Sequence, residues 1–538
     1  MPSLSRGTGK ARETSGGKLN ARKMVSVTCF GGVSEIGGNK ILLEDHNTRL
    51  LFDFGTSFAR RYRSFEEYLK PRPGVGLLDM LYMELIPPLE GIYRRDLAPG
   101  GDFWERWRGH SLYRRLSVDG VLLSHAHLDH SGYISFLDPE IPIHCSAMTA
   151  LVSKAMQGTG QADFEAEACY DKEREPADGL LRSGKVTRQR PFVFVDGLPH
   201  EEGAWEFWRR IPAGRREPCL ATSAHSADRI GALAVRYFPV DHSIFGACAF
   251  AVQTSEGWVA YTGDLRLHGS GQDDTRRWME HMRELRPLAL ICEGTRAGDS
   301  KRVTEAEVRE NASLQVERAS GLVVSDFGPR NVERLLTFLE IARQTVRKLL
   351  VLAKDAYLLE AMHLVAPLRV PDVTDCRDMM VYRDPKIAPR AWESTLLERY
   401  GPRVVGAKEV RAEPESFILS FSFWDVNDLI DIEPQGGTYI YSSSEAYSEE
   451  QRLDLVRLRN WLKHLGMTFV GDPEGGNEGL HSSGHASGPD LLEIIRTVSP
   501  RTLITVHTEE PAYFLTSLRG EAIEVVLPEL GEEISLAS

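Results

Sequence analysis

The sequence predicts an α/β protein of two or three domains, and three observations support this prediction. The chain has 538 residues, more than a single hydrophobic core usually serves. Its composition, 42% apolar and 26% charged, is ordinary for a globular protein. From about residue 296 onward, short apolar runs of strand length alternate with helical stretches, which indicates a parallel sheet with crossover helices.

Composition and charge narrow the class of protein. No apolar run approaches the roughly 20 residues needed to span a bilayer, so no membrane association is expected. Residues 1–23 are basic and lack an apolar centre, which predicts a disordered tail and not a secretory signal. The seven cysteines show no CxxC spacing and indicate reduced thiols in a cytoplasmic protein. The net charge of −13 argues against a globally basic nucleic-acid binder but allows a nuclease with a local positive cleft.

The first strands are predicted at residues 24–30, 41–43 and 49–54, the last two as a hairpin. Between them, GGVSEIGGN either brings the backbone close to a site or forms a plain turn. Asp53 stands in the apolar segment LLFDFG, and a buried carboxylate needs partners. It either fixes the ring of a metal-binding histidine or caps a turn.

Two stretches, at about 57–118 and 157–218, are predicted as insertions. The first mixes arginines with aromatic residues such as Tyr62, Trp104 and Trp107. Such a mixture either stacks nucleic-acid bases or packs against the scaffold. The second is polar and charged and is interpreted as an insertion or a mobile region.

The segment VLLSHAHLDH, residues 121–130, has the highest density of candidate metal ligands. A buried strand at 121–123 ends at Ser124, and a turn with three histidines and an aspartate follows. His125 and His127 project to one side of this turn, whereas Asp129 and His130 can face a second point nearby. One turn can therefore serve two adjacent cations, and imidazole with carboxylate suits zinc. The alternative is a histidine-rich loop without a metal.

Other predicted strands also end on polar side chains, and strand ends hold sites rigidly. The predicted strands at 232–240, 247–254, 258–262, 288–292 and 502–506 lead into or lie next to His242, Asp264, Glu293 and His507. In the second half, strands are predicted at 322–325, 349–353, 417–421 and 438–441, with helices at 331–345, 355–364 and 448–465.

With these motifs in place, the sequence resembles the metallo-β-lactamase fold and, within it, the β-CASP nucleases of the ribonuclease J group. HAHLDH matches the HxHxDH motif of the fold, and GGVSEIGGN, DHSIFGA, YTGDLRLHG and HSSGHAS resemble segments of that group. The resemblance implies an αββα sandwich over 24–295, completed by 471–538. A β-CASP α/β domain over 296–470 would be inserted into it and cap the cleft.

The resemblance also implies a pair of Zn²⁺ ions, with Mn²⁺ as the alternative, and it assigns their ligands. His125, His127 and His242 would hold one ion, Asp129, His130 and His507 would hold the second, and Asp264 would bridge them. Asp53 would orient a ligand histidine. His268, close to Asp264, either packs structurally or plays a similar orienting part.

The activity implied is that of a ribonuclease that hydrolyses phosphodiester bonds through a hydroxide activated by two metals. His485, oriented by Glu293, would stabilise or protonate the leaving oxygen, and Asp129 could accept the proton of the attacking water. RNA would enter as a single strand, to be cut as by an endonuclease, a 5′–3′ exonuclease or both. His507 favours RNA because the DNA-repair branch has an apolar residue there. His481, Ser483, Gly484 and Arg330 would contact the RNA phosphates.

Three rival functions are a DNA nuclease of the same fold, a small-ester metallohydrolase, and an inactive RNA-binding subunit. The large inserted domain and His485 argue against the esterase, and the complete ligand set argues against the inactive subunit. Dimers of ribonuclease J use an additional C-terminal domain that this sequence does not show, which leaves monomer and homodimer open.

Overall fold

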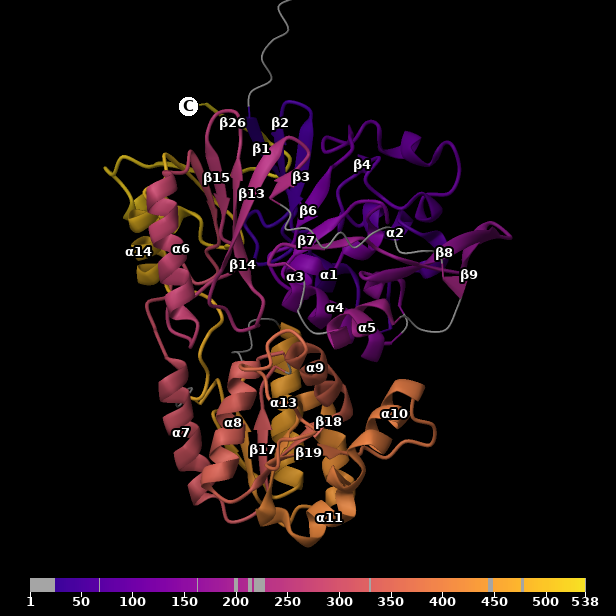
Figure 1. The fold of residues 1–538 in the computed structure, drawn as a ribbon, viewed down its shortest axis with the longest axis vertical. Coiled ribbons are helices and arrows are strands. Elements are labelled where there is room, and N and C mark those ends of the chain that lie inside the picture. Colours follow the sequence, from indigo (N-terminus) through magenta and orange to yellow (C-terminus); the bar gives the residue numbers. More distant parts are fainter. Residues whose placement is uncertain are drawn as a thin grey trace, which may run out of the picture.

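The computed structural model describes residues 25–537 except 67, 162, 198–201, 211–214, 217–227, 329, 444–448 and 476–478. The predicted basic tail at 1–23 lies outside the described residues. None of the helices described is both long enough and apolar enough to cross a membrane. The described chain forms two lobes, the upper one with two seven-stranded sheets and the lower one with a third (Figure 1).

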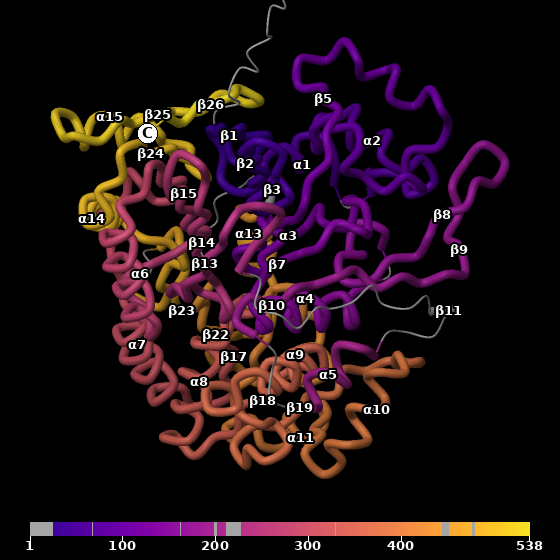
Figure 2. Tube along the Cα trace, turned by 45° about the horizontal axis from the view of Figure 1, so that its top comes forward, coloured from indigo at the N-terminus to yellow at the C-terminus, as the bar shows by residue number. Residues whose placement is uncertain are grey.

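The first sheet of the upper lobe has seven strands in the order β10-β7-β6-β3-β2-β1-β26. The hairpin predicted around His46 is confirmed as the antiparallel pair β2 and β3. The late strand β26 pairs with β1, so segments from both ends of the described chain meet in one sheet (Figure 2). The strands are β1 (Val25–Cys29), β2 (Ile41–Asp45), β3 (Thr48–Phe52), β6 (Gly120–Leu122), β7 (Ile143–Cys145), β10 (Phe192–Phe194) and β26 (Glu533–Leu536).

The second sheet also has seven strands, in the order β12-β13-β14-β15-β16-β24-β25. It is antiparallel from β12 to β15 and parallel from β15 to β25. The strands are β12 (Arg229–Ile230), β13 (Leu233–Pro239), β14 (Cys248–Gln253), β15 (Trp258–Tyr261), β16 (Ala289–Cys292), β24 (Thr502–Thr505) and β25 (Glu524–Val526).

These two sheets pack face to face. Side chains alternate between the two faces of each strand, so every second residue points into the core between the sheets. Val27 of β1 and Phe52 of β3 share one core with Phe250 of β14 and Ile291 of β16. Leu51, which points the other way, joins the core beneath the helix α4 (Ala147–Thr159). The outer face of the second sheet is covered by α6 (Gln272–Leu285) and α14 (Gly488–Val498). The predicted αββα sandwich is confirmed.

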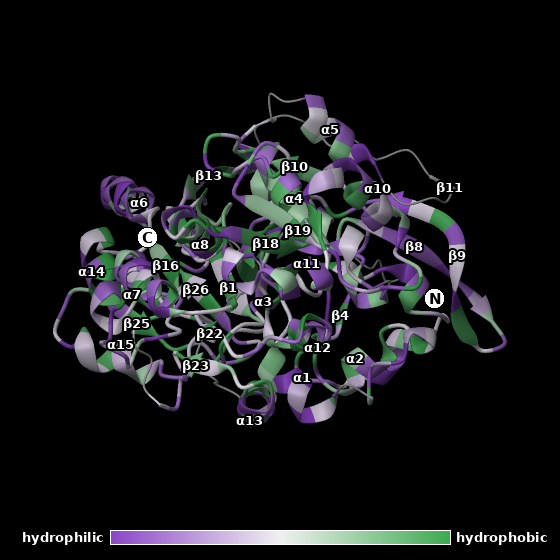
Figure 3. Ribbon diagram, turned by 90° about the horizontal axis from the view of Figure 1, so that it is seen from below, coloured by the Kyte–Doolittle hydropathy of each residue, from purple (hydrophilic) through white to green (hydrophobic). Residues whose placement is uncertain are grey.

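The lower lobe holds the third sheet, whose seven strands are all parallel, as predicted. The order is β20-β19-β18-β21-β17-β22-β23, and α7 lies beside α8 at the left edge of the lobe (Figure 1). Hydropathy along the ribbon shows apolar strands inside polar helices (Figure 3). The strands are β17 (Val323–Asp326), β18 (Lys348–Leu352), β19 (Met379–Tyr382), β20 (Val404–Val405), β21 (Phe417–Ser420), β22 (Thr438–Tyr441) and β23 (Thr468–Val470). The helices are α7 (Glu305–Arg318), α8 (Val332–Gln344), α9 (Ala353–His363), α10 (Ala391–Tyr400), α11 (Ala407–Ala412), α12 (Leu429–Ile432) and α13 (Glu449–His464), with the 3₁₀ helix η8 (Phe423–Asp428).

The stretch 57–118 is built from short elements around a buried arginine. Arg94 is fully buried and pairs with Asp96, Glu167 and Asp171. Trp107 is buried and Trp104 stacks on Tyr93 at 6.0 Å, so these two tryptophans pack against the scaffold. The elements are α1 (Phe58–Ser64), η1 (Pro73–Val75), α2 (Leu78–Tyr82), β4 (Leu89–Glu90), η2 (Arg95–Leu97), η3 (Phe103–Trp107) and β5 (Arg114–Arg115).

The stretch 157–218 contains strands that the sequence pattern did not predict. Phe192–Phe194 is the edge strand β10 of the first sheet, too short for its alternation to be recognised. β8 (Tyr170–Ala177) and β9 (Leu180–Gln189) form a hairpin rich in charged residues. Asp171 and Arg188 in this hairpin join the Arg94 network, so ion pairs take the place of the apolar alternation that marks a strand. The remaining elements are η4 (Ile134–Phe136), η5 (Phe164–Ala166), α5 (Glu202–Arg209), β11 (Arg215–Arg216), η6 (Gly401–Arg403), η7 (Pro414–Ser416) and α15 (Ala512–Ser517).

Candidate metal centre

The predicted ligands come together where the strands of both sheets of the sandwich end. The turn 125–130 follows β6 and contains the short helix α3 (Leu128–Ser131). The other side chains come from the loops after β13, β15 and β24. Among the described residues, two of the groups that could hold a metal ion are His125 with His127 and His242, and Asp129 with His130, Asp264 and His507.

The first group consists of three imidazoles around one point. His127 Nδ1 lies 3.1 Å from His125 Nε2 and 3.1 Å from His242 Nε2. A tetrahedral ion with metal–nitrogen bonds of about 2.0–2.1 Å sets its ligand nitrogens roughly 3.3 Å apart. The observed spacing therefore fits one cation held by three histidines.

The second group mixes imidazole and carboxylate. Asp129 Oδ2 lies 3.2 Å from His507 Nε2, and His130 Nε2 lies 3.0 Å from Asp264 Oδ2. Asp264 Oδ2 is also 3.6 Å from His125 Nε2 and 3.8 Å from His242 Nε2. The Asp264 carboxylate thus stands between the two groups, where a bridging ligand would be required.

The unsatisfied polar atoms of the centre test whether a metal fits there. Among the described residues, both carboxylate oxygens of buried Asp264 and Nε2 of buried His130 have no hydrogen-bond partner. Buried polar atoms without partners cost free energy, and native structures rarely leave several together. Divalent cations between the two groups would satisfy all three atoms, so the donor set fits the metal that the sequence implies.

Asp53 explains how His130 is held. Its Oδ2 lies 2.7 Å from His130 Nδ1 and accepts from the hydroxyl of Tyr261 at 2.6 Å. Its Oδ1 accepts from the Ser124 backbone N–H at 2.7 Å. With Nδ1 bound to Asp53, His130 presents Nε2 to the centre. The geometry matches the orienting role predicted for Asp53 and not a turn cap alone.

His242 and His507 are oriented in the same way by their other ring nitrogens. His242 Nδ1 lies 2.5 Å from the Gly484 carbonyl oxygen, and His507 Nδ1 lies 2.8 Å from Thr295 Oγ1. The Thr295 hydroxyl in turn donates to Glu293 at 2.8 Å. Each histidine therefore turns Nε2 inward, the arrangement usual for metal-binding histidines.

Burial and charge set the protonation of these groups. Burial and the neighbouring imidazoles lower the pKa of His125 and His127 well below the ordinary value, and burial lowers the pKa of His242 to about 4. The three imidazoles are thus neutral at pH 7, the form that binds a metal. Burial opposes ionisation of Asp264, but His130 and His507 outweigh it and lower the pKa of that carboxyl.

His485 stands beside the second group and pairs with Glu293. Its Nδ1 lies 3.0 Å from Glu293 Oε2 and 3.8 Å from Asp264 Oδ2. Burial opposes protonation, yet the Glu293 and Asp264 carboxylates outweigh it and raise the pKa of His485 to about 9. A protonated imidazole with Nδ1 held by Glu293 keeps Nε2 available as a proton donor.

The glycines of GGVSEIGGN provide close approach. Gly37 has φ +78°, and a Cβ placed on it would lie 2.7 Å from the Asp129 Cβ. The Gly38 N–H donates to the Asp129 carbonyl at 2.9 Å. Of the two interpretations of this segment, the close approach to a site is therefore the one observed, because any side chain at Gly37 would displace Asp129.

The predicted RNA-contact residues lie around this centre. The Ser483 carbonyl oxygen accepts from Arg266 Nη1 at 3.0 Å and lies 3.0 Å from His268 Nε2. His268 therefore contacts the backbone of the loop that contains Ser483 and does not orient a candidate metal ligand. His481 Nδ1 is buried and has no hydrogen-bond partner among the described residues. Arg330 extends from the lower lobe, and its charge acts on both His127 and Asp129. Its Nη1 is likewise buried and unpaired within the described chain.

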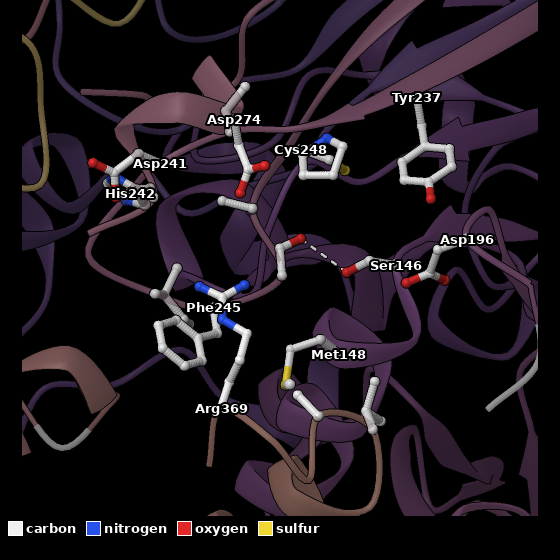
Figure 4. A pocket seen from close by; sticks show the side chains of 18 of the residues that line it. Ser146, Met148, Asp196, Tyr237, Asp241, His242, Phe245, Cys248, Asp274 and Arg369 are labelled. Carbon is white, nitrogen blue, oxygen red and sulfur yellow. Dashed lines mark hydrogen bonds between the residues drawn. The ribbon is translucent and has the colours of Figure 1, made fainter. Parts of the chain in front are cut away.

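The lower lobe also supports the His242 loop from its far side. Met148, Phe245 and Arg369 line a cavity of about 180 Å³ behind His242 (Figure 4). The Arg369 guanidinium lies 4.5 Å from the Phe245 ring centroid. Ser146 Oγ donates to the Gly246 carbonyl at 2.8 Å, the hydrogen bond drawn in Figure 4. These contacts hold the loop that carries His242.

Several supporting residues could not be predicted from the sequence. Tyr261, Thr295 and Asn39 appear in ordinary strand or loop positions, and only the folded chain shows that they connect to Asp53 or His507. The buried pair of Arg266 and Glu305 was also missed, because Arg266 is a common charged residue within YTGDLRLHG and Glu305 lies outside the motifs.

Comparisons with known proteins agree with this fold and site. Residues 477–528 match the family RMMBL, described as a Zn-dependent metallo-hydrolase RNA specificity domain. The chain is similar to ribonuclease J of Mycobacterium tuberculosis, 23% identical over 495 residues, covering 89% of this chain and 68% of that protein. It is also similar to ribonuclease J of Sinorhizobium meliloti, with 24% identity over 414 residues, which cover 74% of this chain and 58% of that protein.

A solved structure extends the likeness to the whole fold. A protein of unknown function from Enterococcus faecalis V583 superposes with a TM-score of 0.66 at 23% identity, covering 95% of this chain and all of that one. The fold and the site together define a metallo-β-lactamase architecture with an inserted β-CASP domain and a site for a divalent metal. Within that class, the sequence is related to the ribonuclease J proteins.

Proposed function

We propose that this protein is a metal-dependent ribonuclease that hydrolyses phosphodiester bonds of single-stranded RNA. The observation that carries the proposal is the buried Asp264 carboxylate, which has no hydrogen-bond partner within the described chain and stands between two groups of metal-ligand type, with His485 beside it. The likeness of residues 477–528 to an RNA specificity domain supports RNA as the substrate. In this proposal 24–295 and 471–538 form the metal-binding lobe and 296–470 forms the cap.

The ligand assignment follows the two groups. His125, His127 and His242 would hold one Zn²⁺ and Asp129, His130 and His507 would hold the other, with Asp264 as a ligand shared by both groups and Mn²⁺ as the alternative metal. Such a cation pair, when bound, acidifies a water molecule and neutralises charge on phosphoryl oxygens.

The remaining steps belong to the side chains of the protein. Asp129 accepts the proton of the attacking water. His485 donates its Nε2 proton to the leaving 3′ oxygen, and Glu293 stabilises the imidazolium until that transfer. Arg330 and the segment His481, Ser483 and Gly484 bind the phosphates on either side and fix the scissile bond in line.

The test is cleavage of matched single-stranded RNA and DNA by metal-free protein reloaded with zinc or manganese. We expect metal-dependent cleavage of RNA, with metal content near two ions per chain. The double variant D129A/H130A should lose cleavage while keeping its circular dichroism spectrum. Faster cutting of DNA would overturn the choice of substrate, and full activity of the double variant would overturn the metal assignment.

Product mapping on RNA with a 5′-monophosphate and with a 5′-hydroxyl determines the mode of action. Single nucleotides released from the 5′ end indicate an exonuclease, and internal fragments indicate an endonuclease. Gel filtration of the same preparation distinguishes monomer from homodimer.

A further inference from the structure

A second pocket lies at the rim where the two lobes meet, beside α1 and α13. It has a volume of about 400 Å³ and is called the rim pocket below. Figure 3 shows α1 of the upper lobe next to α13 of the lower lobe. The rim pocket is lined by Arg61, Tyr62, Phe65 and Glu66 from the first side and by Trp424, Leu453, Asp454 and Arg457 from the other.

The rim pocket presents large apolar side chains, two of them aromatic, to solvent. Trp424 is 75% exposed, Leu453 57% and Tyr62 47%. Tyr62 is stacked on Phe58 at a centroid distance of 5.8 Å, which holds its ring in place. Trp104 and Trp107, from the same arginine-rich stretch as Tyr62, are by contrast packed into the scaffold. Large rings gathered at an exposed pocket are typical of a binding surface.

Guanidinium groups flank these rings. Arg61 binds Glu165 through two hydrogen bonds, and Arg457 pairs with Asp454 at 2.6 Å while remaining largely exposed. Arg63, on the same helix, is exposed. The acids of the pocket are engaged as well, since Glu66 accepts the N–H groups of Tyr68 and Leu69. Aromatic faces beside arginines suit single-stranded nucleic acid, because every base has a face to stack and each nucleotide adds a phosphate.

The rim pocket is also close to the proposed centre along the chain. The Ser57 Cβ lies 2.8 Å from the point where a Cβ on Gly38 would stand, and Gly38 donates to the Asp129 carbonyl. The helix α1 begins directly after Ser57, its N-cap. At a rise of about 1.5 Å per residue, Tyr62 stands roughly 7.5 Å along the helix from Ser57. A strand leaving the centre would therefore reach Tyr62 within a few nucleotides.

From these contacts we propose that the rim pocket is a base-stacking site, in which Tyr62 and Trp424 hold a nucleotide of single-stranded RNA outside the metal centre. This inference rests on the proposed ribonuclease function. Because the two rings come from different lobes, RNA bound there contacts both the metal-binding lobe and the cap.

The test compares a long and a minimal substrate. In Y62A and W424A we expect KM for a single-stranded RNA of about 15 nucleotides to rise roughly 10-fold or more, with kcat unchanged. Hydrolysis of bis(p-nitrophenyl) phosphate, which cannot reach the rim pocket, should be unaffected. W424F should restore most of the RNA affinity. Y82A, which removes an exposed ring from α2, is the matched control and should behave as wild type.

Binding of the same fluorescent RNA to metal-free protein, measured by anisotropy, separates this inference from the proposed function. If no phosphodiester is hydrolysed but Y62A and W424A still weaken RNA binding, the rim site stands and the nuclease assignment fails. Unchanged RNA affinity in both variants would overturn the rim site and assign the pocket to a protein partner. Equal loss on both substrates would also overturn it, because the variants would then act on the catalytic centre itself.

Discussion

Arg266 donates from Nη1 to Glu305 at 3.1 Å, and this pair joins the two lobes through charges shielded from water. Arg266 follows Asp264 in the upper lobe, and Glu305 begins α7, which leads to the lower lobe. Glu305 also accepts from Arg334 of α8 at 2.9 Å, and Arg334 binds the Leu480 carbonyl. The orientation of the cap is thus fixed by ion pairs two residues from the proposed bridging ligand.

Glu305→Ala should destabilise the protein strongly. Arg266 keeps Asp241 and Glu333 as partners, but loss of the Glu305 carboxylate leaves buried Arg334 without a carboxylate partner among the described residues, which costs about 3–5 kcal/mol. The matched control is Glu340→Ala, which breaks an exposed pair with Arg309 and should cost about 1 kcal/mol or less. Urea unfolding followed by circular dichroism measures both. Equal urea midpoints for the two variants would contradict the role of the Glu305 ion pairs in joining the two lobes.

Asp53→Asn should weaken metal binding without unfolding the chain. Asp53 has φ +56°, a conformation that asparagine adopts readily, so the backbone should tolerate the change. The variant loses the carboxylate that holds His130, and we expect metal affinity to fall about 10- to 100-fold. Competition with a chromophoric chelator gives the affinity. Wild-type affinity in the variant would mean that Ser124 and Tyr261 alone orient the histidine.

Arg330→Ala should reduce kcat/KM for RNA while leaving stability unchanged. Nη1 of Arg330 makes no hydrogen bond within the described chain, so loss of this nitrogen breaks no hydrogen bond there. A hydrogen bond to a charged phosphate is worth about 1.5–3 kcal/mol, or roughly 10- to 150-fold in kcat/KM. Added guanidinium ion should recover part of the rate. A large drop in thermal stability would instead point to a structural role.

His485→Gln should lower kcat and spare metal content. Glutamine keeps a hydrogen bond to Glu293 but cannot protonate a leaving oxygen, and general acid catalysis is worth about 10²–10⁴-fold. RNA substrates with a 3′-phosphorothiolate linkage, whose sulfur leaves without protonation, should be cut by the variant at nearly the wild-type rate. If the deficit persisted on that substrate, His485 would not be the proton donor.

Asp326 gives the lower lobe a pH-dependent stability. Burial raises the pKa of Asp326 to about 7, although the Tyr439 hydroxyl donates to it at 2.6 Å. The folded state therefore keeps a proton on Asp326 that the unfolded chain releases near pH 4. The stability that this proton contributes is fully present below pH 4 and is lost as the pH rises to 7. D326N should gain stability relative to wild type between pH 5 and pH 8, by up to about 4 kcal/mol. Urea unfolding midpoints of both proteins at pH 5 and pH 8 test this prediction. A difference in midpoint that is the same at both pH values would contradict it.

The residues that the fold brings together at the candidate site could be selected from the sequence because they follow apolar strands in recognisable motifs. The strand before His125 and the strand before Glu293 are both buried. Glu293 directly follows the last residue of its strand, and His125 lies close to the end of its own. The approach of Tyr62 to Trp424 and of Arg266 to Glu305 could not be predicted, since neither pair belongs to a motif or a shared period. The strand Met379–Tyr382 was missed because periodicity alone cannot distinguish so short an apolar run from a buried helix segment.

The pairing of β26 with β1 has a consequence for synthesis of the protein. Strand β1 gains its outer neighbour only after residues 533–536 have left the ribosome, and the proposed second metal gains His507 only shortly before. A nascent chain therefore carries the histidine-rich turn long before the proposed centre is complete. On the proposed function, the messenger RNA being translated is exposed to an active nuclease only after His507 has left the ribosome.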